Sequence, residues 1–172
     1  MNSQSPAKYF IAIGFLLGAV LGFGGSMVEA GSTMQKCMWE ISSLGLIMAA
    51  ILYARTPIMS GDIFASSGFV ILAIAEAIMS SGTLVGEASQ ATFGAGTGLY
   101  GPALILIAMS SFFAMWIRGA AALSGIAFLI VAGKIFSGEM VGYSSPFPSA
   151  GYALLTLATL GWVWTVLRKP KA

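Results

Sequence analysis

The sequence predicts an all-α membrane protein with six transmembrane helices in one compact bundle, and three observations carry this prediction. Of the 172 residues, 58% are hydrophobic and only 8% are charged, whereas a soluble domain carries about 25% charge. The apolar residues form six runs long enough to cross about 30 Å of hydrocarbon as helices. Polar residues, glycines and prolines separate these runs. We therefore expect residues 1–172 to form a single integral membrane domain whose surface contacts the lipid bilayer.

Composition also narrows the functional classes. The net charge of +2 is too small to indicate nucleic-acid binding. The chain lacks histidine, the usual ligand of membrane haem and copper sites, and its one cysteine, Cys37, excludes an intrachain disulfide. The sequence shows no metal-ligand cluster, phosphate-binding loop or nucleophile–base pair. We expect no metal, no cofactor and no enzymatic activity. A lipid-modifying enzyme that uses Glu76 and serines is an alternative, ranked below the two functional hypotheses given at the end of this section.

The first expected helix, about residues 8–28, contains a stripe of glycines. Gly14, Gly18 and Gly22 recur every fourth residue, so they lie on one face of the helix. Such a bare face lets another helix approach closely in a bilayer. The start of this segment also resembles a cleavable signal peptide, but the apolar run is longer than the usual signal core. We expect a retained helix that packs through its glycines, either where the bundle closes or where neighbouring protomers meet.

The second and third helices are expected at about residues 38–55 and 61–81. The second ends near Arg55, whose side chain can reach the lipid headgroups, and Pro57 then breaks the helix. Asp62 stands beside the first turn of the third helix, where a carboxylate can accept hydrogen bonds from free backbone N–H groups. We expect Asp62 to be a helix cap.

The second half of the chain contains three further apolar runs. Residues 82–99 are rich in glycine, serine and threonine, which predicts an exposed loop because such a segment is too polar to span. Arg118 and Gly119 predict a very short turn between the fourth and fifth helices. These last helices are expected at about residues 100–117, 120–137 and 150–167.

The positions of the lysines and arginines predict the orientation. With six spans, both termini lie on one side of the membrane together with six of the eight basic residues, and the other two lie opposite. An excess of basic residues marks the cytoplasmic side, so we expect a bacterial or archaeal cytoplasmic membrane with both termini in the cytoplasm. The six are Lys8, Arg55, Arg118, Arg168, Lys169 and Lys171, and the two are Lys36 and Lys134.

Two of the expected helices resemble each other. Aligning residues 65–82 with residues 122–139 gives seven identities in eighteen positions, among them Ser67 with Ser124. Both segments run in the same direction, which is the pattern of a parallel repeat. The implied unit is a two-helix hairpin, and three hairpins would leave a seam along the axis. Chance similarity between apolar helices is the alternative interpretation.

Glu76 and Lys134 are ionisable residues placed well inside expected spans, whereas Glu40, one turn into the second helix, is expected at the outer membrane interface. An ionisable side chain in a span is costly, so it normally faces the bundle interior or water and marks a functional site. Lys134 falls beside the Glu76 position in the repeat alignment, which suggests an ion pair between them. The functional interpretation is a charged vestibule or a protonatable gate, and the structural one is an ion pair at the outer interface.

Uncharged side chains offer further candidates for a solute path or gate. Phe64 and Phe69 are candidates for apolar constrictions that gate by excluding water, or they serve packing and lipid contact. Ser67 and Ser124 are candidates for a weakly polar lining, or they bond backbone carbonyls of their own or a neighbouring helix.

Two segments resemble the acetate uptake transporters, also called succinate–acetate permeases. The sequence Gly-Asp-Ile-Phe-Ala-Ser-Ser-Gly-Phe at residues 61–69, after Ala54 and Arg55, resembles the turn that opens a transmembrane helix in that family. The sequence Val-Ala-Gly-Lys-Ile-Phe-Ser-Gly at residues 131–138 resembles one of its helix ends. The resemblance implies a homo-oligomer, a hexamer, in which each protomer has a narrow path for small monocarboxylates. Related urea and amide channels share the hairpin architecture.

The sequence thus supports two functional hypotheses of different classes. The first is a small-solute channel or transporter, with acetate-like monocarboxylates as the implied substrates. The second is a non-catalytic membrane subunit or scaffold, in which the glycine stripe and the segment 82–99 would bind a partner protein.

Overall fold

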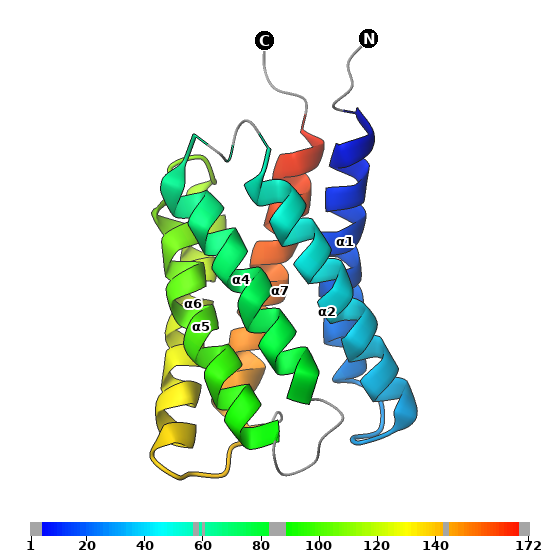
Figure 1. Ribbon diagram of the computed structural model, residues 1–172, viewed down its shortest axis with the longest axis vertical. Coiled ribbons are helices and arrows are strands. Elements are labelled where there is room, and N and C mark those ends of the chain that lie inside the picture. Colours follow the sequence, from blue (N-terminus) through cyan, green and yellow to red (C-terminus); the bar gives the residue numbers. More distant parts are fainter. Residues whose placement is uncertain (1–4, 57–58, 60, 83–88, 143–144, 169–172) are drawn as a thin grey trace.

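The computed structural model describes residues 5–56, 59, 61–82, 89–142 and 145–168, and these form six helices (Figure 1). Each helix is long and apolar enough to cross a membrane, and the described residues include no strand. The predicted fold class is therefore confirmed. Predictions for Pro57, residues 83–88, Lys169 and Lys171 lie outside the described residues. The helices are α1 (Ser5–Gly25), α2 (Thr33–Ala54), α4 (Ile63–Gly82), α5 (Ser89–Met109), α6 (Met115–Phe136) and α7 (Pro146–Leu167).

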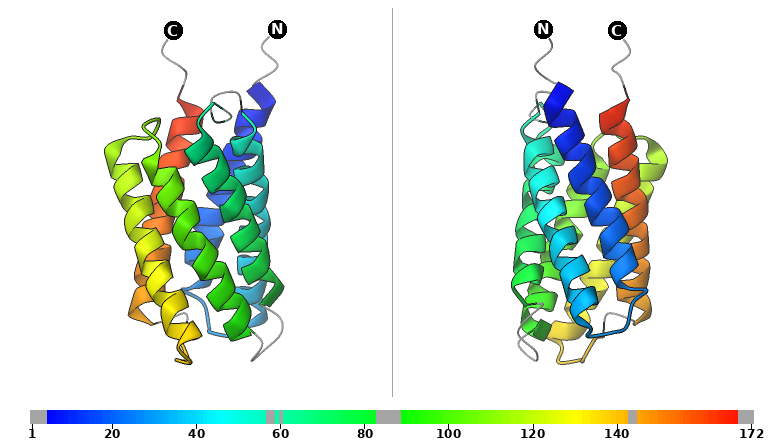
Figure 2. Two further views of the ribbon diagram at one scale, coloured as in Figure 1. Left: turned by 60° about the vertical axis from the view of Figure 1, so that its left-hand side comes forward. Right: turned by 90° about the vertical axis from the view of Figure 1, so that its right-hand side faces the viewer.

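The helices form a closed ring. Each packs against its neighbours in the chain, and α7 packs against α1 (Figures 1 and 2). Successive helices run in opposite directions, so α1 begins and α7 ends at the same end of the bundle, here called the terminal end. The other end, where α1 leads into α2 and α6 leads into α7, is called the opposite end. The contact between α1 and α7 is the one that the hairpin interpretation requires.

The helix bounds differ most from the prediction in the middle of the chain. α5 begins at Ser89, so the loop predicted over residues 82–99 is wrong for residues 89–99, and Pro102 lies inside the helix. The polar run is helical because it is packed inside the protein. Thr97 is fully buried and donates its hydroxyl to the carbonyl of Phe93 at 2.8 Å. A threonine that bonds its own helix in this way needs no water.

The turn between the fourth and fifth helices is also displaced. α5 ends at Met109 and α6 begins at Met115, so the turn lies at residues 110–114 and not at Arg118 and Gly119, which belong to α6. Arg118 still lies at the terminal end, because it sits in the first turn of α6, and its Nε donates to the carbonyl of Ala108 at 2.7 Å.

The glycine stripe of α1 faces α2 and not α7. A Cβ at Gly14 would stand 2.6 Å from the carbonyl oxygen of Gly45, and a Cβ at Gly18 would stand 2.4 Å from the side chain of Leu46. Gly22 approaches the hydroxyl of Ser42 in the same way. The stripe therefore brings α1 and α2 into close contact, and the expectation that it closes the ring or joins protomers is wrong. Small residues were the right signal for close packing, but the partner is the next helix in the chain.

Asp62 caps α4, as predicted. One carboxylate oxygen accepts the backbone N–H groups of Phe64 and Ala65 at 3.1 and 3.0 Å, and the other accepts the hydroxyl of Ser110 at 2.5 Å. The bond from Ser110 is the main reason that the pKa of Asp62 lies below its usual value; the two backbone bonds act in the same direction and partial burial opposes them. The cap thus joins the start of α4 to the residue that follows α5.

Candidate functional site

A cavity of about 230 Å³ lies inside the ring, in the half of the bundle toward the opposite end. Its walls come from α1, α2, α4, α5 and α7, whereas no described residue of α6 lines it. The polar part of the lining is small and the rest is apolar or aromatic, which is typical of small-molecule sites. The polar and aromatic lining residues are Phe23, Ser26, Trp39, Ser42, Ser43, Glu76, Ser80, Tyr100, Ser149, Tyr152, Thr156 and Thr159.

Glu76 supplies the one carboxyl group among the described lining residues. It sits on α4 and is 5% exposed. Its Oε1 accepts the hydroxyl of Ser43 from α2 at 2.7 Å, whereas its Oε2 has no hydrogen-bond partner among the described residues. The predicted placement of Glu76 toward the bundle interior is thus found in the structure. A carboxylate oxygen left unbonded in an interior is expensive, and it commonly marks a place where another molecule binds.

A second carboxylate–hydroxyl contact lies about one turn closer to the opposite end. Ser80 of α4 donates its hydroxyl to Oε2 of Glu40 on α2 at 2.7 Å, and Oε1 of Glu40 has no hydrogen-bond partner in the described parts of the chain. The two contacts are reciprocal, because α2 supplies the serine to Glu76 and the glutamate to Ser80. Together they hold both carboxylates at the seam between α2 and α4. The sequence interpretation missed this arrangement and placed Glu40 at the membrane interface.

Tyr100 supplies a further polar group without a partner. It lines the cavity from α5 and is fully buried, and its hydroxyl has no hydrogen-bond partner within the described residues. Its ring packs on Phe128 with centroids 5.0 Å apart, which fixes the direction of the hydroxyl. Tyr152, on the α7 wall, packs on the same phenylalanine at 5.0 Å. Phe128 of α6 therefore supports the rings of both tyrosines on the side away from the cavity lining.

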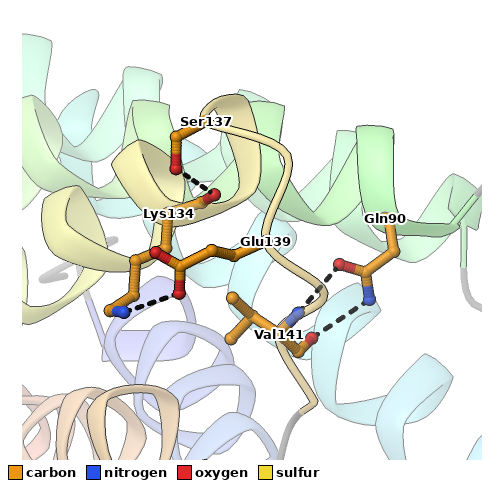
Figure 3. A network of polar contacts seen from close by, with 5 residues as sticks. All are labelled: Gln90, Lys134, Ser137, Glu139 and Val141. Carbon is orange, nitrogen blue, oxygen red and sulfur yellow. Dashed lines mark hydrogen bonds and ion pairs between the residues drawn. The ribbon is translucent and has the colours of Figure 1, made fainter.

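Lys134 does not pair with Glu76. Its Nζ lies 2.7 Å from Oε2 of Glu139, and the pair sits on the surface at the end of α6 (Figure 3). α6 ends at Phe136. Gly138, two residues further on, has a φ of +92°, and its N–H donates to the carbonyl of Ile135. This left-handed glycine turns the chain so that Glu139 returns over the last turn of the helix. The expected Glu76–Lys134 pair is therefore wrong, because Lys134 binds the residue that follows its own helix.

The loop after α6 is also fixed by Gln90 of α5. The side-chain amide of Gln90 donates to the carbonyl of Val141 at 3.0 Å and accepts the Val141 N–H at 3.3 Å (Figure 3). These two hydrogen bonds to the backbone hold the loop against α5, beside the surface pair of Lys134 and Glu139.

The cavity lining includes no lysine or arginine among the described residues. Arg55 and Arg118 lie at the terminal end, and Arg168 lies over the ring of Trp164 at 4.7 Å. Lys36 lies in the first turns of α2. Glu76 thus faces a cavity without a basic side chain in this part of the structure.

A layer of aromatic side chains fills the terminal half of the ring. Phe15 of α1, Tyr53 of α2, Phe69 of α4 and Trp162 of α7 are each at most 5% exposed, and Phe113 from the turn after α5 joins them. Neighbouring ring centroids lie 5.0 to 6.3 Å apart, which is the usual spacing of packed aromatic pairs. These five residues, called the aromatic layer, close the space between the cavity and the terminal end.

The remaining predicted site residues lie in different places. Phe69 belongs to the aromatic layer, as expected of a constriction, but Phe64 is 44% exposed on the outside of α4. Ser124 is buried and donates to the carbonyl of Gly151 at 2.8 Å, so it joins α6 to α7, and it is not among the cavity-lining residues. Ser67 is half-buried and is also absent from the lining. Of the six candidates, Glu76 thus lies at the cavity and Phe69 in the aromatic layer, and a role in a solute path stays a prediction.

Comparisons with protein-family models, with curated proteins and with solved structures find no match to this chain. Groups of three or more histidine, cysteine, aspartate or glutamate side chains that could hold a metal ion do not occur in the described part of the chain. The site is therefore described by its own chemistry: a partly open, mostly apolar space with one buried carboxylate, several hydroxyls, aromatic walls and a packed aromatic layer on one side.

Proposed function

We propose that the protein carries a small solute across the membrane and that the cavity is its binding site. The observation that supports this most strongly is that the cavity and the aromatic layer follow one another along the axis of the bundle. A cavity that holds an incompletely bonded Glu76 lies toward the opposite end, and the aromatic layer closes the bundle toward the terminal end. Six helices that only had to pack would have no reason to leave an internal space beside a buried carboxylate.

The arrangement suggests how passage would be controlled. A solute enters from the opposite end, displaces water and contacts Glu76. Movement to the terminal end requires the rings of Phe69 and Trp162 to separate, because these rings pack 5.0 Å apart across the ring of helices. The aromatic layer is then the gate, and a carrier that alternates between two closed sides fits this geometry better than an open channel.

The cavity lining bears on the choice of substrate. The resemblance to acetate uptake transporters implies small monocarboxylates such as acetate, and that implication stays a prediction, as does the homo-oligomer. Because the described lining holds a carboxylate and no basic side chain, an acetate anion would meet like charge, whereas a neutral or positively charged solute would not.

The proposal is tested by flux through proteoliposomes that contain the full chain. Uptake or swelling is measured with acetate, urea, glycerol and small ammonium salts against protein-free vesicles. We expect flux of at least one of these solutes, and expect Phe69→Leu to change its rate while Phe64→Leu leaves it unchanged, since Phe64 lies on the outside of α4. The absence of flux above the protein-free control for every solute would overturn the proposal.

The structure removes the main observation on which the scaffold hypothesis was based. That hypothesis required the glycine stripe of α1 to be free for a partner protein, but Gly14 and Gly18 contact α2 within the same chain. We therefore propose transport and not a scaffold or an enzyme. If the chain showed no flux and co-purified with a partner protein in a fixed ratio, the scaffold hypothesis would be favoured again.

A further inference from the structure

We infer that the cavity binds a small organic cation, a solute with an ammonium group, and that Glu76 is its counter-ion. This inference deepens the proposed transport function and rests on it only for the claim that the solute crosses the membrane. Four features of the cavity support it: the missing partner of Glu76, the position of the basic residues, the aromatic walls and the size of the space.

Glu76 lacks a partner that would neutralise it. The hydroxyl of Ser43 bonds Oε1 at 2.7 Å, but a hydroxyl carries no charge, and Oε2 has no hydrogen-bond partner among the described residues. A buried carboxylate is tolerated when a positive charge accompanies it, and leaving it alone is costly. A cationic ligand would remove this cost on binding, so the site would favour a cation over a neutral molecule of the same shape.

The chain itself does not supply the positive charge in the described structure. Lys134 is bound to Glu139 at the surface, Arg118 bonds a backbone carbonyl near the terminal end, and Arg168 stacks on Trp164. The lining contributes no lysine or arginine within the described ranges. The counter-ion of Glu76 is therefore expected to arrive with the ligand.

The walls suit an organic cation. Trp39, Tyr100 and Tyr152 present aromatic rings to the cavity from α2, α5 and α7, and an ammonium group is attracted to the face of such rings. Tyr100 lines the cavity, and its buried hydroxyl has no hydrogen-bond partner in the described chain, so a polar group of a bound ligand could supply one. Glu40, one turn nearer the opposite end, adds negative potential along the approach to Glu76.

The size of the cavity argues against a bare metal ion. A hard cation requires about six oxygen ligands at short distance, but the hydroxyl of Ser42 already donates to the carbonyl of Gly18, and the described residues form no metal-ligating cluster. A volume of about 230 Å³ is larger than the engineered cavities of about 150 Å³ that hold a benzene molecule. A small organic molecule fills such a space, and a single ion does not.

The test measures binding to the purified full chain in detergent micelles by titration calorimetry. The probes are methylammonium, tetramethylammonium and choline chlorides, and 3,3-dimethylbutan-1-ol serves as the neutral analogue of choline, with carbon in place of the charged nitrogen. We expect at least one cation to bind, and the neutral alcohol to bind at least about tenfold more weakly than choline. This comparison uses the unmodified protein, so it does not depend on the folding of any variant.

Two variants then locate the charge. Glu76→Gln keeps the size of the side chain and removes its charge, so we expect the affinity for the bound cation to fall at least about tenfold. Glu139→Gln is the matched control, because it removes the same charge outside the cavity, and the affinity should stay within about twofold of the unmodified chain. Tyr100→Phe, which removes only a hydroxyl, replaces Glu76→Gln if that variant fails to fold, and it should weaken choline binding several-fold.

Several results would overturn the inference. They are no binding of any of the three cations, equal binding of choline and its neutral analogue, Glu76→Gln without effect, or binding of sodium ions alone. Because binding is measured without a membrane, its outcome is separate from that of transport. Cation binding without flux in proteoliposomes would refute transport and leave this inference standing, and flux of urea, glycerol or acetate without cation binding would do the reverse.

Discussion

Ser43 and Glu76 form the contact on which the site depends: the serine hydroxyl of α2 donates to the glutamate of α4 at 2.7 Å inside the ring of helices. Ser80 and Glu40 repeat this contact in the reverse direction between the same helices. Antiparallel packing explains the pair, because positions 40 and 43 advance toward the terminal end while positions 76 and 80 advance away from it. Two carboxylate–hydroxyl bonds, one buried and one partly buried, thus fix the register of α2 on α4.

Removal of the Ser43 hydroxyl should destabilise the protein. Ser43→Ala leaves Glu76 without any hydrogen-bond partner in the described chain, and a buried acceptor deprived of its donor costs about 1–3 kcal/mol. Ser66→Ala is the control, since the hydroxyl of Ser66 donates to the carbonyl of Ile63, one turn back in its own helix, in an exposed bond. Unfolding in micelles measures both variants, and equal stability of the two would contradict this role of Ser43.

The double variant separates the bond from its neighbours. Where Glu76→Gln is already present, Ser43→Ala should cost less than in the unmodified chain, because the acceptor no longer carries a charge. A coupling free energy near zero between the two changes would mean that the hydroxyl stabilises α2 in some other way.

The sequence predicted the helices well because apolar runs dominate a chain dissolved in lipid. It placed Asp62 correctly, since a cap depends only on residues close by in the chain. The helical turns of residues 89–99 were missed because the burial of Thr97 depends on neighbouring helices. Glu76 was found from its depth in a span, whereas the contacts of Ser43 and Glu40 were not predicted, because they depend on the register between α2 and α4.

The error on Lys134 has a different cause. Lys134 was placed by its position along the helix, and that position does not determine the direction of a side chain. Gly138 reverses the chain directly after the helix and brings Glu139 within reach. A local partner five residues away was available, and the distant partner Glu76 was not needed.

The glycine stripe predicts opposite effects for two matched substitutions. In Gly18→Ala the new Cβ would stand 2.4 Å from the side chain of Leu46, whereas at Gly133 nothing lies within 4 Å of it. We expect Gly18→Ala to destabilise by about 1–3 kcal/mol, because α1 must move away from α2. Gly133→Ala should be neutral or stabilise by up to about 1 kcal/mol, because alanine is the better helix former. Unfolding measurements check the pair, and a stabilising Gly18→Ala would show that α1 and α2 do not pack as described.

Asp62 predicts a dependence of stability on pH. Since the pKa of Asp62 is lower in the folded protein than its ordinary value of 3.8, its contribution is fully present above that ordinary value. The contribution is lost as the pH falls through the lower pKa of the folded state. Asp62→Ala should cost about 1 kcal/mol at neutral pH, from loss of the cap, and less in acid. Thermal unfolding between neutral and acidic pH measures this, and a constant difference between the two proteins would contradict it.

The aromatic layer predicts a leak when its central ring is made small. Trp162 is fully buried and packs on Phe15 and Phe69, so Trp162→Phe should leave a gap and raise the flux of glycerol through proteoliposomes several-fold. Trp164→Phe is the control, because Trp164 lies two residues further along α7, is 57% exposed and stacks with Arg168. Flux that rises equally in both variants would assign the leak to the lipid-facing surface and not to the gate.

Cys37 provides a direct test of orientation. It is the one cysteine of the chain, it is exposed, and it lies in the first turns of α2 at the opposite end. The described basic residues at the terminal end are Lys8, Arg55, Arg118 and Arg168, against Lys36 and Lys134 at the opposite end, which predicts cytoplasmic termini. A membrane-impermeant maleimide added to intact cells should therefore label Cys37. The double variant Cys37→Ser with Ser111→Cys moves the thiol to an exposed position at the terminal end, and it should be labelled only after the membrane is permeabilised. The reverse pattern would place the termini outside and turn the mouth of the cavity toward the cytoplasm.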